Sequence, residues 1–260
     1  MIRLDRYCSQ MGVATRSEIS LWCKKWLIWV DNQIIRYADT KILRWSIISI
    51  TDVTGQIIWQ AECKQFVTLL LNKPAWYVCS DMDEGWHRSY KNLLVGSPYR
   101  RSLHVAWRLD QDTTWLVVCT NDGDLNHRII SPKHKLIKTY LVTCAKPLTN
   151  EMITNLESWV LLDDGYTTLP AKASLITYEE TNALFDHLFE GAVMSTVQWC
   201  FLKLQITEGK YHQVKRMLEG VDNEVIGLHR LSIGRWTTDW LQSGEWTLID
   251  PLTNPCNFDQ

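Results

Sequence analysis

The sequence predicts an α+β fold, with a small N-terminal domain over residues 1–60 and a larger domain with a mixed, mainly antiparallel sheet over residues 66–250. Three observations predict it. Runs rich in Val, Leu, Ile and Thr recur along the chain. Stretches with helical spacing between them are few, which favours α+β over a doubly wound fold. A short polar stretch at residues 60–65 separates the two domains.

The N-terminal segment predicts a helix followed by short strands. Met11-Gly12 suits a turn, and residues 14–18 suit a helix start with Thr15 or Ser17 as the N-cap. Apolar residues at helical spacing follow. Asp31-Asn32 interrupts the apolar run at 27–35 and predicts a hairpin, and residues 47–53 predict another strand.

The larger segment predicts strands at 67–72, 116–120, 139–144 and 197–207, and helices at 150–158 and 211–219. A closing strand is expected at 247–249. The tail from Pro251 is expected to be frayed.

Charge is uneven on a chain whose net charge is only −2. Residues 1–60 carry eight Lys and Arg against five acids, and residues 86–140 carry nine against four. Two basic segments on a near-neutral chain suggest two phosphate-facing patches. Two solvated faces are the alternative interpretation.

The eight cysteines exclude some classes of site. No two have C-x-x-C spacing, which argues against a zinc or redox centre. The N-terminus has no apolar signal-peptide core, and no apolar run approaches the ~18 residues that span a membrane. We therefore expect reduced thiols, a cytoplasmic location and no membrane contact.

The segment at 103–118 places polar, reactive groups just before an apolar strand, where catalytic side chains often lie. Its central residue is Asp110. A turn-capping role is the alternative for one aspartate, and paired carboxylates with Asp112 would suggest a hydrolase.

Several motifs together resemble the pseudouridine synthase family. A-W-R-L-D-Q-D-T-T-W-L around Asp110 is similar to the family's G-R-L-D-x-x-T-T-G-L. L-N-K-P-A-W-Y-V-C-S, T-N-D-G-D-L-N-H-R, S-P-K-H, K-T-Y-L-V and E-G-K-Y-H-Q-V-K-R-M follow the family's order along nearly the whole chain. The last of these and S-P-K-H most resemble the branch that modifies small-subunit 16S rRNA. Residues 3–6, 14–17 and 30–31 resemble a small α-L RNA-binding domain named after a small-subunit ribosomal protein.

The resemblance implies conversion of one particular uridine of 16S rRNA to pseudouridine, with no cofactor or metal. It implies Asp110 as the catalytic carboxylate, Tyr140 as the ring that stacks on uracil, and Lys215 as the partner of Asp110, with Arg216 or Lys210 as alternatives. The partner would be ribosomal RNA or a small-subunit assembly intermediate, bound by a monomer. The candidate RNA-binding residues are Arg3, Arg16, Lys24, Lys25, Lys73, Arg108, Arg128, Lys138, Lys210 and Arg216.

Two other functions fit the same motifs. The chain could be a non-catalytic or weakly active RNA-binding relative, or a synthase that acts on large-subunit rRNA. Four histidines in the motifs are expected to be structural or to contact RNA: His104, His127, His134 and His212.

Tryptophan is abnormally frequent, at 14 of 260 residues. Eight tryptophans stand where the family pattern or turn chemistry calls for glycine: Trp26, Trp45, Trp76, Trp107, Trp115, Trp159, Trp236 and Trp240. Each would cost about 1–3 kcal/mol in backbone strain if glycine is required there. One hypothesis is that UGA codons, read as glycine in the source organism, were translated as tryptophan. The alternative is a genuinely Trp-rich and inactive homologue.

Overall fold

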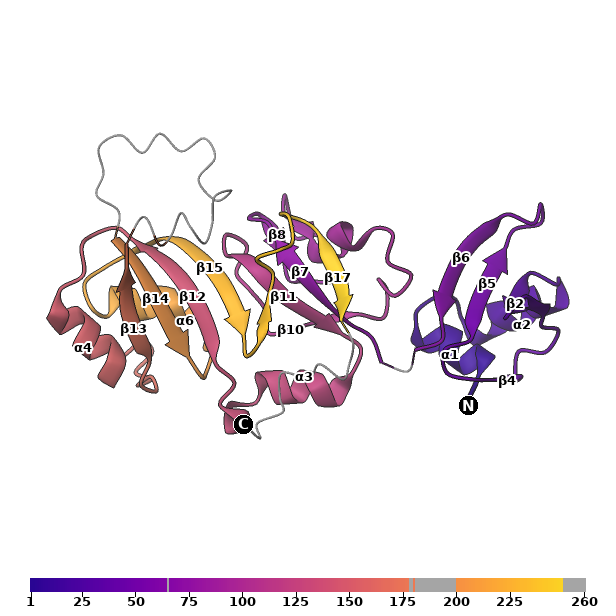
Figure 1. Cartoon of the computed structure of the whole chain (residues 1–260), viewed down its shortest axis with the longest axis horizontal. Coiled ribbons are helices and arrows are strands. Elements are labelled where there is room, and N and C mark those ends of the chain that lie inside the picture. Colours follow the sequence, from indigo (N-terminus) through magenta and orange to yellow (C-terminus); the bar gives the residue numbers. More distant parts are fainter. Residues whose placement is uncertain (65, 178–179, 181–199, 250–260) are drawn as a thin grey trace.

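The computed structural model describes residues 1–64, 66–177, 180 and 200–249. An N-terminal unit lies at one end of an elongated molecule, and a long twisted sheet forms the rest (Figure 1). The predicted α+β class is confirmed. The frayed tail expected from Pro251 lies outside the described residues.

The N-terminal unit packs two helices against a small antiparallel sheet. The helices are α1 (Leu4–Gln10) and α2 (Arg16–Lys24). The sheet order is β3-β2-β5-β6, and β1 pairs separately with β4. Their bounds are β1 (Ile2–Arg3), β2 (Ile28–Val30), β3 (Gln33–Ile34), β4 (Lys41–Ile42), β5 (Ile47–Thr51) and β6 (Ile57–Glu62).

Local sequence explains two features of this unit. Thr15 caps α2 and forms a capping box with Glu18, as the first of the two predicted N-caps. Asp31 and Asn32 have φ of 49° and 64° and turn β2 into β3, because short polar side chains tolerate the left-handed region that tight hairpins need.

The expected linker at residues 60–65 starts too early, because β6 continues to Glu62. Hydrogen bonds join β6 of the N-terminal unit to residues 98 and 99 of the larger domain. The indole N–H of Trp59 donates to the carbonyl of Pro98 at 3.2 Å, and the hydroxyl of Tyr99 donates to the carbonyl of Glu62 at 3.0 Å.

The large sheet has the order β13-β14-β12-β15-β11-β7-β17, with β10 paired to β11 and β16 paired to β15. Among the described strands of this sheet, β11 and β15 run parallel and every other pair is antiparallel. This confirms the mixed, mainly antiparallel sheet. Its strands are β7 (Thr68–Lys73), β10 (His104–Ala106), β11 (Thr114–Thr120), β12 (Lys138–Cys144), β13 (Lys172–Ile176), β14 (Cys200–Ile206), β15 (Val225–Ile233), β16 (Trp236–Thr237) and β17 (Trp246–Ile249).

The remaining elements flank this sheet. They are β8 (Tyr77–Val78) and β9 (Arg88–Ser89), the 3-10 helices η1 (Tyr90–Leu94) and η2 (Pro132–His134), and the helices α3 (Gly123–Ile130), α4 (Asn150–Ser158) and α6 (Gln213–Glu219). Among the described residues, no helix has the length and apolarity to cross a membrane.

Predicted and observed elements agree where the pattern is strong. The helix at 150–158 is confirmed with the same bounds, and the strands at 67–72, 116–120 and 139–144 differ by at most two residues. The strand expected at 197–207 is described only from Cys200, because 197–199 lie outside the described residues. The helix expected from residue 211 begins at Gln213, since His212 is left-handed and cannot continue a helix.

Candidate active site

Asp110 lies in the loop between β10 and β11, two strands that pair with each other. The backbone N–H of Thr113 donates to the carbonyl of Asp110 at 3.2 Å and closes a turn. The side chain of Asp110 is 27% exposed. A loop fixed at both ends by paired strands holds the carboxylate in place and leaves it open to a ligand.

Two side chains around the start of α6 reach Asp110. Nζ of Lys215 lies 3.6 Å from Oδ2, and Nε2 of His212 lies 3.4 Å from Oδ1. Nζ of Lys215 also donates to both carboxylate oxygens of Asp112, at 2.7 and 2.8 Å. His212 has φ of 49°, and strained backbone of this kind clusters at functional sites.

Of the three basic residues considered as partners of Asp110, Lys215 is the one that the structure brings next to it. The guanidinium of Arg216 is turned away and pairs with two acids, Asp163 and Asp164. Nζ of Lys210 lies 4.2 Å above a tyrosine ring, that of Tyr166. Lys215 and Arg216 are neighbours on α6 and so point to different sides of the helix, and Lys210 lies before the helix begins.

Tyr140 on β12 lines a small cavity together with Asp110, His212 and Trp107. Its side chain is 6% exposed. The cavity has a volume of about 50 Å³, whereas typical ligand pockets have ~300 Å³ or more. Asp110 and Tyr140 therefore border a space that is nearly filled, and Lys215 lies beside Asp110 without lining that space.

The structure corrects the interpretation of Lys73 and Lys138 as phosphate contacts, because both are 0% exposed. Nζ of Lys73 donates to the carbonyls of Pro74 and Gln111, at 2.9 and 3.1 Å. Nζ of Lys138 lies 3.6 Å from the centre of the Trp107 ring. Burial lowers the pKa of both lysines to about 8. Lys73 thus ties down the loop that carries the carboxylate.

Arg230 on β15 also holds the loop that carries Asp110, and the sequence analysis did not identify this residue. It is 0% exposed. Its Nε donates to the carbonyl of Leu116 at 2.9 Å, and Nη2 donates to the carbonyl of Trp107 at 3.0 Å. These two carbonyls lie on either side of Asp110 in the chain, so one side chain fixes both ends of the loop. The sequence does contain an indication of this role, because Arg230 is a single arginine within an apolar strand. An arginine is rarely buried without a partner.

His212 is a second residue that sequence reasoning undervalued. The sequence predicts a structural or RNA-contacting role for this histidine, and the structure adds that its ring faces the carboxylate of Asp110. Its place in Y-H-Q-V-K-R-M, three residues before Lys215, was the available signal, because residues three apart at a helix start share a face.

Comparison with known proteins decides the family. A family model described as RNA pseudouridylate synthase matches residues 67–220. The chain belongs to the RNA pseudouridine synthases. It is 33% identical to an uncharacterized RNA pseudouridine synthase of Bacillus subtilis, over 92% of this chain and 90% of that protein. It is 34% identical to ribosomal small subunit pseudouridine synthase A of Haemophilus influenzae, over 97% and 96%.

A solved structure agrees with this assignment. A crystal structure of a pseudouridylate synthase is 29% identical and covers 96% of both chains, with a TM-score of 0.59. The synthase is an isomerase, since pseudouridine and uridine have the same atoms. The family indicated by the sequence motifs is confirmed, and the family model covers residues 67–220 of the stretch in which those motifs lie.

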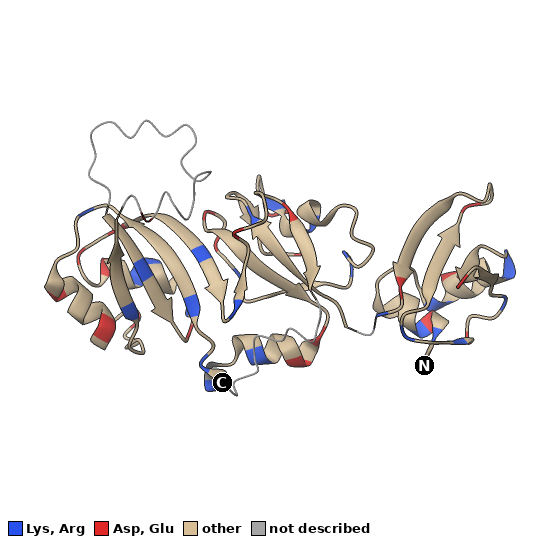
Figure 2. Cartoon of the chain, viewed as in Figure 1, with Lys and Arg blue, Asp and Glu red and all other residues tan. Residues whose placement is uncertain are grey.

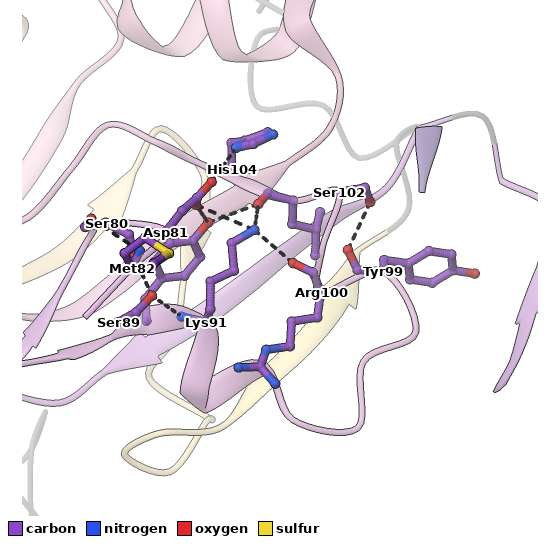
Figure 3. A network of polar contacts seen from close by, with 11 residues as sticks. Ser80, Asp81, Met82, Ser89, Lys91, Tyr99, Arg100, Ser102 and His104 are labelled. Carbon is purple, nitrogen blue, oxygen red and sulfur yellow. Dashed lines mark hydrogen bonds and ion pairs between the residues drawn. The ribbon is translucent and has the colours of Figure 1, made fainter. Parts of the chain in front are cut away.

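A polar network forms around Lys91, between η1 and the segment that leads into β10 (Figure 3). Nζ of Lys91 donates to the carbonyls of Arg100, at 2.9 Å, and Leu103, and lies 3.6 Å from Asp81. Nδ1 of His104, the first residue of β10, lies 3.4 Å from the same aspartate. Burial lowers the pKa of Lys91. Lys91 therefore joins Lys138 as a basic residue of the 86–140 segment that points into the protein, so only part of that segment can face phosphate.

The other candidate RNA-binding residues lie on the surface or near it. Figure 2 shows Lys and Arg on both the N-terminal unit and the large sheet, mixed with Asp and Glu. Arg128 is half-buried, and Arg3 pairs with Asp5 at 2.8 Å. The exposed members are Arg3, Arg16, Lys24, Lys25, Arg108 and Lys210.

A groove of about 550 Å³ runs between the N-terminal unit and the catalytic domain. Arg6 and Arg44 line it from one side, and His104 and the half-exposed ring of Phe66 line it from the other. Cations beside an aromatic ring suit single-stranded nucleic acid, whose phosphates and bases they can bind together.

Proposed function

We propose that this synthase converts one uridine of small-subunit 16S rRNA to pseudouridine, with Asp110 as the catalytic carboxylate and without a cofactor. The observation that carries the proposal is the position of Asp110. Its two oxygens lie 3.6 and 3.4 Å from Lys215 and His212, beside the cavity that Tyr140 lines.

The geometry suits the chemistry. The bond from uracil nitrogen to the ribose carbon breaks, the base turns, and a bond forms from a ring carbon to the same ribose carbon. Bond breaking builds positive character on the sugar, which a carboxylate can stabilise or attack. Lys215 places a positive charge beside that carboxylate, with Nζ 3.6 Å from Oδ2.

Tyr140 supplies the second part of the reaction. Its ring would stack on the uracil while the base turns, and its hydroxyl would assist removal of the proton from the ring carbon that forms the new bond. That proton passes to the nitrogen released from the sugar, so atoms balance. The uridine must leave its stack to reach Asp110, and the exposed Arg108, next to the loop, would fill the gap or hold phosphate.

The choice of 16S rRNA is supported by the small-subunit synthases that this chain matches over nearly its full length. We propose that a monomer acts in the cytoplasm, on rRNA or on a small-subunit assembly intermediate. The N-terminal unit over residues 1–60 would bind the RNA backbone through Arg3, Arg16, Lys24 and Lys25, and the catalytic domain over 66–250 would add Arg108, Arg128 and Lys210. Arg216 is left out of this set because its guanidinium pairs with Asp163 and Asp164.

The test is to map pseudouridine in the rRNA of a strain that lacks this gene. We expect one site of 16S rRNA to lose the modification and to regain it when the gene is restored, but not when the restored gene carries Asp110→Asn. Loss of a site in large-subunit rRNA would instead support the second candidate substrate. Unchanged rRNA in the deletion strain would contradict the proposal.

A further inference from the structure

Five tryptophans have a backbone conformation that glycine normally provides. Their φ angles lie between 64° and 80°: Trp26, Trp45, Trp76, Trp107 and Trp115. Outside glycine only a few per cent of residues have positive φ, and most of them are Asn, Asp or His. Five of fourteen tryptophans is far above that rate. Bulky side chains are strained there because Cβ approaches the neighbouring carbonyl.

The other three positions where the sequence suggests glycine do not have positive φ. Trp159 has φ of −172°, an extended angle that any residue adopts. Trp236 and Trp240 do not have positive φ either. The backbone therefore supports glycine at five of the eight positions that the sequence suggested and gives no such support at the other three.

Trp107 has a second anomaly, which concerns the active site. Its ring covers Nζ of Lys138 at 3.6 Å. It lies so close to the backbone of Gly209 that a Cβ atom on that residue would overlap the ring. The ring lines the same cavity as Asp110 and Tyr140. An aromatic ring thus occupies the space beside the carboxylate where a flat base would have to lie.

We propose that these five positions are glycine in the protein as its own cell makes it, encoded by UGA, and that glycine at position 107 opens the uracil pocket. The inference about the uracil pocket rests on the proposed function. Without the indole, the space between Gly209 and Lys138 joins the cavity of Asp110 and Tyr140. A uracil ring takes the place of the indole, and Lys138 faces its carbonyl oxygens as a hydrogen-bond donor.

The first test reads the codons of the gene. We expect UGA at positions 26, 45, 76, 107 and 115, with glycine in peptides of the protein isolated from its own cells. We expect UGG at Trp59, whose indole N–H makes a hydrogen bond to Pro98 and whose ring is needed at the junction. UGG at positions 107 and 115 would overturn the inference.

The second test measures stability, which requires no assumption about RNA. Trp26, Trp45 and Trp76 are 52%, 60% and 62% exposed, so loss of their rings removes only surface contacts, with Arg36, Lys64 and His87 respectively. Each change to glycine should raise Tm by about 2–8 °C. Trp86→Gly and Trp159→Gly are matched controls, exposed by 100% and 59% and without positive φ. They should leave Tm unchanged or lower it. Equal behaviour of both groups would contradict the inference.

Trp115 is left out of the stability series because its ring is 5% exposed and packs against Leu141 and Phe201. Relief of strain and loss of packing oppose each other there.

The third test compares turnover on uridine-containing 16S rRNA. Trp107→Gly should raise turnover by about 100-fold or more, since a ring in the base site prevents productive placement. Trp86→Gly should leave turnover unchanged. If the tryptophan-bearing protein is already as active as the Trp107→Gly variant, the pocket inference fails. If the exposed sites gain stability but no variant acts on any rRNA, the proposed function fails and the glycine assignment stands.

Discussion

Nζ of Lys215 lies closer to Asp112, at 2.7 Å, than to Asp110, at 3.6 Å. The two carboxylates therefore have different roles. Asp112 is 46% exposed and makes the direct ion pair, which fixes the lysine in place. Asp110 is less exposed, at 27%, and receives the field of the lysine while its oxygens stay available to a ligand. This asymmetry distinguishes the site from a paired-carboxylate hydrolase, in which both acids face the substrate.

Asp110→Asn should abolish turnover and leave RNA affinity nearly unchanged. In the proposed reaction the carboxylate acts on charge that develops in the transition state, whereas affinity comes mainly from phosphate contacts. Loss of one such electrostatic group usually costs ~100-fold or more. The measurement is single-turnover pseudouridine formation in the Trp107→Gly background, together with an RNA-binding titration. A variant that retains more than about a tenth of the rate would contradict the assignment.

Asp112→Asn is the matched control for that variant. It removes a carboxylate two residues away that only holds Lys215. Because ion pairs between partly exposed groups contribute about 1 kcal/mol or less, turnover should fall by less than about tenfold. A loss as large as that of Asp110→Asn would mean that the two acids act as a pair.

Lys215→Met should lower turnover strongly, by about 100-fold, because it removes the cation beside the proposed catalytic carboxylate. Lys215→Arg keeps the charge and should recover part of the rate. The adjacent Arg216→Met is the control, since that guanidinium pairs with Asp163 and Asp164 and does not reach the site. Equal losses for Lys215→Met and Arg216→Met would indicate that helix α6 is disturbed and would contradict a specific role.

Arg230→Met should lower kcat more than it changes KM. Both carbonyls that Arg230 holds would lose a charge-assisted hydrogen bond, worth ~1.5–3 kcal/mol each, and the Asp110 loop would loosen. Arg230→Lys keeps the charge but lacks the fork that reaches both carbonyls, so it should recover only part of kcat.

Lys91→Met is the control for Arg230. It removes another buried cation that donates to two carbonyls, those of Arg100 and Leu103. Neither carbonyl belongs to the loop that carries Asp110. Both variants should lower Tm, but only Arg230→Met should lower kcat in protein that remains folded. If the two variants lose kcat in proportion to their loss of Tm, Arg230 is structural and does not position the loop.

The sequence predicted what depends on local pattern and on motif chemistry. The helix at 150–158 has a capping threonine and a clear apolar spacing, so its bounds could be predicted. Asp110 and Lys215 could be paired because each lies in a motif with a known partner. Burial could not be predicted for Lys73 and Lys138, because a lysine within an apolar strand has the same local sequence whether its amine reaches solvent or a carbonyl of a distant loop. Arg230 was missed for the same reason, since its partners are more than a hundred residues away in the chain.

RNA binding should depend on the exposed cations of α2 and its C-cap. Changing Arg16, Lys24 and Lys25 together to Ala removes up to three phosphate contacts. The slope of log affinity against log salt should become shallower by about 2, at ~0.7 per contact for single-stranded RNA. Lys203→Ala, on the exposed face of β14 at the other end of the molecule, is the control (Figure 1). An unchanged slope in a filter-binding titration would argue against an RNA-binding role for the N-terminal unit.

Acid should destabilise the synthase through His229. Burial lowers the pKa of His229 from 6.5 to about 4, and its Nδ1 makes a hydrogen bond with the hydroxyl of Thr114. Above pH 6.5 the ring is neutral in the folded and unfolded chains. Between pH 6.5 and about 4 the unfolded chain takes up a proton that the folded chain does not, so unfolding becomes more favourable as the pH falls. This contribution to stability is fully present above pH 6.5 and is lost as the pH falls through about 4. Tm measured from pH 7 to 4.5 should therefore fall more steeply for the wild type than for His229→Gln, even if that variant has a lower Tm at neutral pH. Parallel curves for the two proteins would show that the ring is not kept neutral by burial.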